Sequence, residues 1–336
     1  MITTPTSKGS TVPSCKATQV VEFFKQAAVK IFPETFTNKC RPRWLWEALK
    51  SVRGPLYPAE PLKNLLREKF DDLHLSDALT SVIIPAFDTN NEVPVFFSNV
   101  KSVDSAKPLY NVLVRDACQA TTAVPVFFPA AHFDEKLQNQ PGTPKVFNVI
   151  DGGIAVNDPT LVAVTQGIAE RRQAIGKEKI DFKNVLVLSL GTGQHPMRFL
   201  AKPHWSSVQW LLNPSGSPLF NSFFSASEDM VEYYTSMIFD AHESGHHYLR
   251  IQTDRLSTSE FWEIDDATRG NLDTLWKTAG DLLTHTVSKR NFATGKLEDH
   301  PDGGTNEDAL RRFARWLVDE RRERERERQR QQPTVN

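Results

Sequence analysis

The most constraining feature of this sequence is a set of short, almost wholly aliphatic runs separated by segments with helical periodicity. Residues 184–190 read NVLVLSL and lead directly into a glycine-containing turn at 191–193. Shorter strand candidates, each with polar residues among the apolar ones, occupy 145–150 and 248–252. Strands that are apolar on both faces are typical of sheets covered by helices on both sides. The pattern therefore predicts an α/β fold with a parallel or mixed sheet between helical layers.

The remaining elements follow from periodicity, prolines and caps. Two strands joined by a turn are predicted over 80–87 and 93–98, with Pro85 and Pro94 at sheet edges or strand ends. Asp158 is expected to cap a helix whose first residue is Pro159. Further helices are predicted over 17–32, 44–49, 61–70, 110–121, 225–241, 271–284 and 306–318.

The C-terminal segment 320–336 differs from the rest, because Glu and Arg alternate through most of it. We interpret it as a solvated extension of the last helix that frays at its end, which leaves 1–319 as the folded domain. An RNA-binding arm is the alternative, and the Glu residues weaken it by cancelling much of the Arg charge.

Charge and hydropathy limit the partners and the location. Lys and Arg number 40 and Asp and Glu 41, a formal net charge of -1, which argues against a globally basic nucleic-acid binder. No run approaches the ~20 apolar residues of a membrane-spanning helix, and residues 1–14 lack the apolar core of a signal peptide. We therefore expect no nucleic-acid partner and a cytoplasmic location; a vacuolar one would require a leader ahead of Met1.

The strongest candidate for chemistry is Asp151, followed by Gly152 and Gly153, at the end of the run 145–150. Carboxyl ends of buried strands are where α/β proteins place functional groups. A carboxylate there could act as a general base, and the two glycines would let backbone approach closely. The alternative is an Asp that is satisfied by the amides of its own turn.

Other motifs are weaker. His242 to His246 matches H-E-x-x-H, the zinc-protease pattern, but Gly245 interrupts the helix that would place both imidazoles on one face. Gly191 to Gly193 could begin a phosphate loop, although a tight strand exit packed in the core fits better. No two glycines lie four positions apart, so the sequence holds no G-x-S-x-G nucleophile elbow.

Several segments, in order, resemble the plant patatin-like lipid acyl hydrolases. The most specific is Asp151-Gly152-Gly153 followed by Ala155, Asn157, Asp158, Pro159 and Thr160. The others are 78–99, 113–133, 184–193, 248–252 and 304–322. The resemblance implies a three-layer fold with a mostly parallel central sheet, no cofactor and no metal, and membrane glycerolipids or fatty acyl esters as substrates, with peripheral membrane contact allowed.

The chemistry that the resemblance implies is a Ser–Asp dyad without a catalytic His. Asp151 matches the dyad Asp, and Gly152 and Gly153 complete its motif. The family's first strand, oxyanion loop and G-x-S-x-G serine have no counterpart here, and Met1 resembles a residue just after the elbow. We therefore expect the chain, by itself, to be poorly stable and inert towards acyl esters, the activity that its family implies. A storage or interaction protein of the same fold, a nutrient reservoir for example, and a metalloprotease using His242 and His246 are the alternatives.

Overall fold

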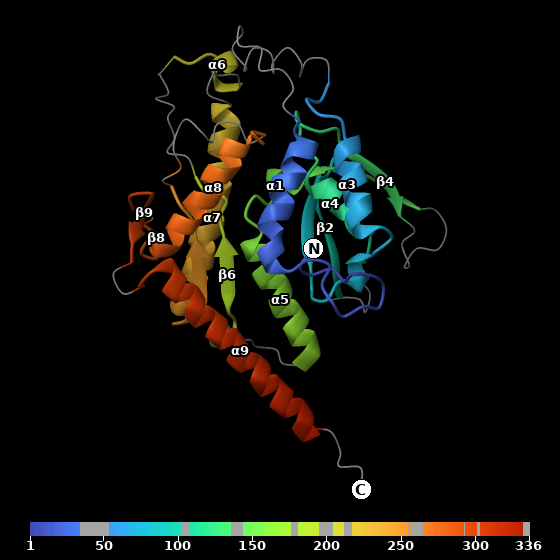
Figure 1. Cartoon of the computed structure of the whole chain (residues 1–336). Helices are drawn as coiled ribbons and strands as arrows, with labels where there is room; N and C mark the ends of the chain where they lie inside the picture. The colour runs from blue at the N-terminus through green and yellow to red at the C-terminus, as the bar shows by residue number, and fades with distance from the viewer. Residues whose placement is uncertain are drawn as a thin grey trace.

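The chain folds into two α/β parts with the helix α5 (Thr160–Ile175) between them (Figure 1). The computed structural model describes residues 1–33, 54–101, 108–135, 144–175, 181–194, 204–211, 217–254, 256, 265–291, 293–300 and 303–331. On one side α5 contacts strand β2 (Val93–Lys101), and on the other it contacts β6 (Val187–Leu190) and α7 (Pro218–Ala241).

The first part is a five-stranded sheet in the order β3-β2-β1-β5-β4. Its pairings are all antiparallel. The helix α4 packs on β1, β4 and β5, and α3 packs on α4. The aromatic and aliphatic side chains between them form one core cluster around Phe97 and Phe147, which are fully buried. The elements not yet bounded are β1 (Ile83–Asp88), β3 (Pro108–Tyr110), β4 (Ala131–Glu135), β5 (Lys145–Asp151), α1 (Val20–Ile31), α3 (Glu60–Phe70) and α4 (Val114–Thr121).

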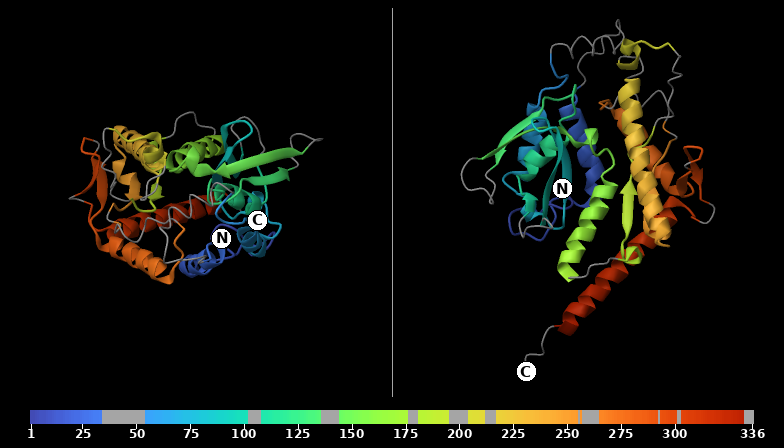
Figure 2. Two further views of the ribbon diagram at one scale, coloured as in Figure 1. Left: turned by 90° about the horizontal axis from the view of Figure 1, so that it is seen from above. Right: turned by 180° about the vertical axis from the view of Figure 1, so that it is seen from behind.

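The second part is built on β6 and β7 (Tyr248–Ile251), which pair in parallel. Its core cluster joins Leu249 and Ile251 of β7 to Phe313 of α9, with Leu282 of α8 packed against it. Behind these strands runs α7, and α9 extends away from the body of the molecule (Figures 1 and 2). The remaining elements are α6 (Ser207–Leu211), α8 (Arg269–Thr284), α9 (Asn306–Gln331) and the hairpin of β8 (Ser288–Asn291) and β9 (Lys296–Asp299).

The predicted α/β class, with helices flanking a central sheet, is confirmed. The predicted strand direction is not. In the part of the chain that the structure describes, only β6 and β7 pair in parallel. A short turn between β1 and β2 forces them to run antiparallel, and an aliphatic run reports burial rather than direction. The mostly parallel sheet is therefore wrong for the described strands.

Pro85 shows how the sheet tolerates a proline in β1, which is an inner strand. Pro85 pairs with Phe96 of β2, while the pairing of β1 with β5 begins one residue later, at Ala86. Pro85 thus lies where β1 has a neighbour on one side only, so its missing N–H leaves no gap in the ladder. The prediction of a sheet edge or strand end is therefore wrong for Pro85 and correct for Pro94, the second residue of β2.

The helix predicted from 110 begins at Val114, because Tyr110 ends β3, while the predicted extension of the last helix into the charged segment is confirmed as far as Gln331. Helix α7 begins at Pro218 rather than 225, with the proline in its first turn. Helix α9 continues through the charged segment to Gln331, where Arg324–Glu320 and Arg321–Glu325 pair at 2.7 and 2.9 Å. The helix expected at 44–49 and the fraying of 332–336 lie outside the described residues.

The edge of β6 is apolar and open. Among the described residues β7 is its only strand neighbour, and Leu188 and Leu190 are 39% and 65% exposed. Within the same residues, no helix combines the length and the apolar character that a bilayer-spanning segment requires. The expected low stability of the chain stays a prediction.

Candidate functional site

Asp151 is the last residue of β5, as the sequence predicts. Its Cα pairs with that of Ala86 in β1, and its backbone N–H donates to the carbonyl of Ala123 at 3.0 Å. Two strands and the end of α4 therefore fix the backbone from which the carboxylate projects. The short helix η3 (Gly152–Ile154) follows immediately and turns the chain away from the sheet.

The Asp151 carboxylate is half-buried, and one of its two oxygens accepts a hydrogen bond. Oδ1 accepts a hydrogen bond from the Gly153 N–H at 2.7 Å, while Oδ2 accepts none from the described residues. Burial raises the pKa of Asp151, and the Gly153 amide opposes that rise. Both interpretations of the motif thus hold in part: a turn amide satisfies one oxygen, and the other is left for a ligand or a proton.

At Gly152 and Gly153 neighbouring atoms come too close to leave room for a side chain. A Cβ on Gly152 would lie 2.4 Å from the Pro85 carbonyl oxygen, which belongs to the neighbouring strand. A Cβ on Gly153 would lie 2.8 Å from Asp151 Oδ1 and would press on the carboxylate. The prediction that these glycines let backbone approach closely is confirmed for Gly152.

The loop after Gly153 is held by its own cap and by a buried charge. Asp158 Oδ1 accepts from the Thr160 N–H at 2.8 Å, so Asp158 caps α5, which begins one residue later than predicted. Its Oδ2 lies 3.0 Å from Arg250 Nη1, and both side chains are buried. The strand β7, which carries Arg250, is thereby joined to the loop that begins at Asp151.

Arg250 belongs to a larger polar network that sequence analysis did not find. Its Nη1 donates to Ser189 Oγ at 2.6 Å, and its Nη2 pairs with Glu228 of α7. A second arginine, Arg290 of β8, pairs with Glu232 of α7 at 3.1 Å. One sequence feature could have predicted this network: an arginine inside an apolar strand. Buried charges require partners, so such an arginine implies acidic residues nearby.

The H-E-x-x-H string does not form the zinc-protease arrangement. Helix α7 ends at Ala241, Glu243 has a φ of 55°, and His246 lies in the short helix η5 (Gly245–His247). His242 stacks on Phe182, with ring centroids 4.5 Å apart. No group of three or more His, Cys, Asp or Glu that could hold a metal occurs among the described residues. The geometry therefore gives the metalloprotease alternative no support.

Gly191 and Gly193 form a packed strand exit. A Cβ on Gly191 would lie 2.3 Å from the Gln252 side chain, and one on Gly193 would lie 2.5 Å from Leu256. The Gly193 N–H donates to Gln252 Oε1 at 2.8 Å. Side chains already fill the space that a phosphate would need, which confirms the packed interpretation over the phosphate loop.

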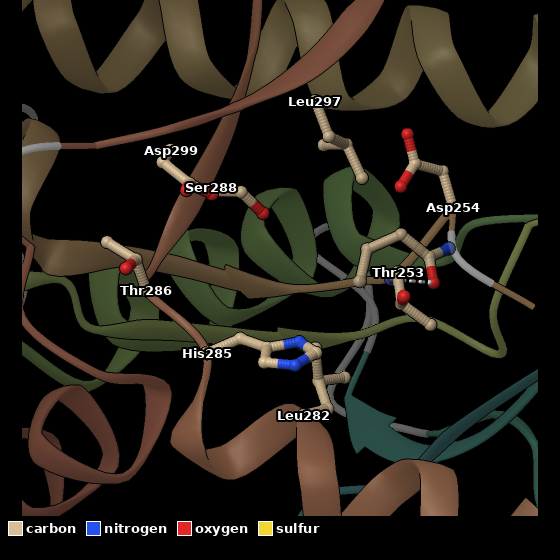
Figure 3. A pocket seen from close by; sticks show the side chains of 9 residues that line it. Thr253, Asp254, Leu282, His285, Thr286, Ser288, Leu297 and Asp299 are labelled. Atoms are coloured by element: carbon tan, nitrogen blue, oxygen red, sulfur yellow. Dashed lines mark hydrogen bonds between the residues drawn. The ribbon is translucent and has the colours of Figure 1, made fainter.

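A small polar pocket lies at the end of β7, beside the β8–β9 hairpin (Figure 3). Thr253 lies beside His285, which follows α8, while Asp254 lies farther from it, and Ser288 and Asp299 come from the hairpin (Figure 3). None of its lining residues belongs to the loop after Asp151. Its two carboxylates do not form a metal-binding group, since the described part of the chain contains none.

The comparisons with known proteins agree with the motif around Asp151. The family model for patatin-like phospholipase matches residues 16–164, which include Asp151, Gly152 and Gly153. Patatin-like protein 2 of Oryza sativa subsp. indica is 37% identical over 337 residues, covering 96% of this chain and 80% of that protein. Patatin-like protein 3 of Arabidopsis thaliana is 34% identical, covering 94% and 74%. Patatin-15 of Solanum tuberosum is 32% identical, covering 96% and 76%. The chain belongs to the patatin-like phospholipase family, a family of lipolytic acyl hydrolases.

Proposed function

We propose that this chain supplies the general base of a patatin-type acyl hydrolase and that Asp151 is that base. The observation that carries the proposal is the Asp151 carboxylate at the end of β5, with Oδ1 held by the Gly153 amide and Oδ2 without a partner among the described residues. Because burial raises the pKa of Asp151, the carboxylate is a better proton acceptor than an exposed one.

In this mechanism Asp151 accepts the proton of a serine hydroxyl while the serine oxygen attacks the carbonyl carbon of an acyl ester. Asp151 then donates this proton to the departing alkoxide, so the alcohol leaves and an acyl-enzyme remains. In the second half Asp151 takes a proton from a water that attacks the acyl carbonyl, and it returns the proton to the serine oxygen as the fatty acid leaves. The substrates are membrane glycerolipids or other fatty acyl esters. The serine of the family's G-x-S-x-G motif is not in this sequence, so the proposal assigns to the chain the base alone.

The test joins the chain to a G-x-S-x-G segment from a plant relative and measures hydrolysis of a short-chain fatty acyl ester. We expect no hydrolysis by the chain alone and measurable hydrolysis by the fusion. Asp151→Asn in the fusion should lower kcat by about 10³-fold or more, since removal of a catalytic base has effects of that size.

Asp134→Asn is the matched control, because Asp134 is an exposed carboxylate on the neighbouring strand β4. It should leave the activity of the fusion unchanged. Full activity in the Asp151→Asn fusion would refute the proposed base. A folded fusion without any activity would instead favour the second candidate, a storage or interaction protein of the same fold.

A further inference from the structure

Exposed apolar side chains gather on α6 and on the first turns of α7, which contact each other at one end of the ribbon (Figure 1). We call this patch the tip surface. Val208, Phe220 and Phe223 are 64%, 53% and 55% exposed, values that ordinary core residues do not have. Its six members are Val208, Trp210, Leu211, Leu219, Phe220 and Phe223.

The segment that carries the tip surface, residues 205–227, contains no charged residue, and this limits what can bind there. From Trp205 to Ser227 the sequence contains no Asp, Glu, Lys, Arg or His, in a chain that is 24% charged. A surface without charge offers nothing to an anionic or a cationic partner. Its electrostatic complement is an apolar surface that is itself uncharged or has no net charge.

The side-chain types indicate a lipid surface rather than a protein groove. Trp205 and Trp210 pack edge to face at 5.4 Å, and Phe, Leu, Ser and Asn make up much of the segment. Tryptophan and phenylalanine are enriched where proteins meet the boundary between lipid headgroups and acyl chains. The helix α6 and the start of α7 lie at one end of the ribbon in Figure 1 and in the right-hand view of Figure 2.

The tip surface is connected to the candidate base. Asn157 Nδ2 donates to the backbone carbonyl of Phe224, next to Phe223, at 3.3 Å. Asn157 lies in the loop that begins at Asp151, and a Cβ on Gly153 would be 3.5 Å from Asn157 Oδ1. The start of α7 and the loop that carries the carboxylate are therefore neighbours.

We propose that the tip surface seats the protein on a zwitterionic lipid layer and so presents acyl esters to Asp151. This inference rests on the proposed function for its purpose, although binding itself does not require hydrolysis. Because the surface is uncharged, the binding should be insensitive to salt and to the anionic lipid content, unlike binding through basic residues.

The experiment is cosedimentation of the purified chain with phosphatidylcholine vesicles at low and high salt. We expect binding at both salt concentrations and at least a tenfold loss of affinity in Phe220→Ser/Phe223→Ser. Val208→Asp, which places one charge in the surface, should cause a comparable loss. Circular dichroism checks that each variant keeps its helices.

The control is Leu317→Ser/Val318→Ser on α9, where two side chains of similar exposure, 50% and 46%, lie outside the tip surface. It should bind vesicles like the unmodified chain. Binding that disappears at high salt, or that both double variants lose equally, would overturn the inference. So would a dimer in vesicle-free solution that Phe220→Ser/Phe223→Ser dissociates, because a second copy would then occupy the surface.

The two proposals fail in distinguishable ways. A fusion that hydrolyses a soluble ester with Asp151 dependence, but whose tip variants bind vesicles normally, supports the base and refutes lipid docking. If the chain binds vesicles through Phe220 and Phe223 but the Asp151→Asn fusion stays active, lipid docking is supported and the proposed base is refuted.

Discussion

At the scale of single residues, Asp151 is held in an environment that disfavours its charge. Burial raises the pKa of Asp151 above its value in the unfolded chain, and the Gly153 amide recovers part of that cost. A carboxyl group with a raised pKa stabilises the fold only while it is protonated, and its ionisation is a cost at higher pH. Functional groups often carry such a cost in stability.

We therefore expect Asp151→Asn to raise the melting temperature at pH 7 by about 1–3 °C. The amide oxygen can still accept from the Gly153 N–H, so the change removes the charge and keeps the contact. As the pH falls through the pKa of Asp151, the carboxyl group becomes neutral in the unmodified chain and the difference should vanish. Thermal melts between pH 7 and about pH 3, which extend below the unfolded-state pKa of 3.8, measure this, and a difference independent of pH would contradict it.

Gly152 gives a second prediction at this scale. Gly152→Ala should lower the free energy of unfolding by about 1–3 kcal/mol, because the new methyl group would meet the Pro85 carbonyl, which the sheet holds in place. Gly167→Ala is the matched control, since it lies inside α5 with open space around its Cβ position, and it should be neutral or stabilising. Urea unfolding of both variants tests the difference in sign.

The sequence predicted Asp151 but not Arg250, for a physical reason. A carboxylate followed by two glycines at the end of an aliphatic strand is a local pattern, which one segment contains completely. The partners of Arg250 come from the loop before α5 and from α7, far apart in sequence. Only the folded chain brings these charges together, so no spacing rule could have paired them.

At the scale of elements, α7 buries polar side chains beside apolar Phe239 and leaves apolar ones exposed. Glu232 and Thr235 are buried on its inner face, while Met230, Tyr234 and Met237 are 45%, 50% and 51% exposed. The arginines of β7 and β8 account for the inner face, because they pair with its glutamates. Periodicity predicted the helix, but it did not predict that glutamates would be buried on its inner face.

Arg250→Met tests the importance of these buried pairs. We expect a loss of about 3–5 kcal/mol in the free energy of unfolding, since Asp158 and Glu228 would remain in the interior without their shared cation. Arg321→Met breaks an exposed pair with Glu325 on α9 and should cost less than about 1 kcal/mol. Similar losses in both variants, by urea unfolding, would show that burial does not strengthen the Arg250 pairs.

At the scale of the whole molecule, the open edge of β6 is the main hazard to solubility. Exposed, unpaired strand edges with apolar side chains pair with other chains unless charges block them. Leu188 and Leu190 occupy such an edge in the described part of the chain.

We expect the unmodified chain to associate with concentration and Leu188→Lys/Leu190→Lys to stay monomeric at the same helix content. Leu317→Lys/Val318→Lys, on α9 away from any strand edge, should associate like the unmodified chain. Light scattering over a concentration series distinguishes them. Equal association in all three proteins would place the contact elsewhere than on β6.

The two core clusters are also separate along the chain, and this has a consequence for biosynthesis. Every buried member of the first cluster lies between Phe70 and Val149, and every buried member of the second lies between Leu249 and Phe313. Domains generally fold as units, from the N-terminal end first, while the ribosome is still translating. The first cluster should thus be complete on the nascent chain before any buried residue of the second is made. Asp151, two positions after Val149 in the same strand, would then be in place before any buried residue of the second cluster is made.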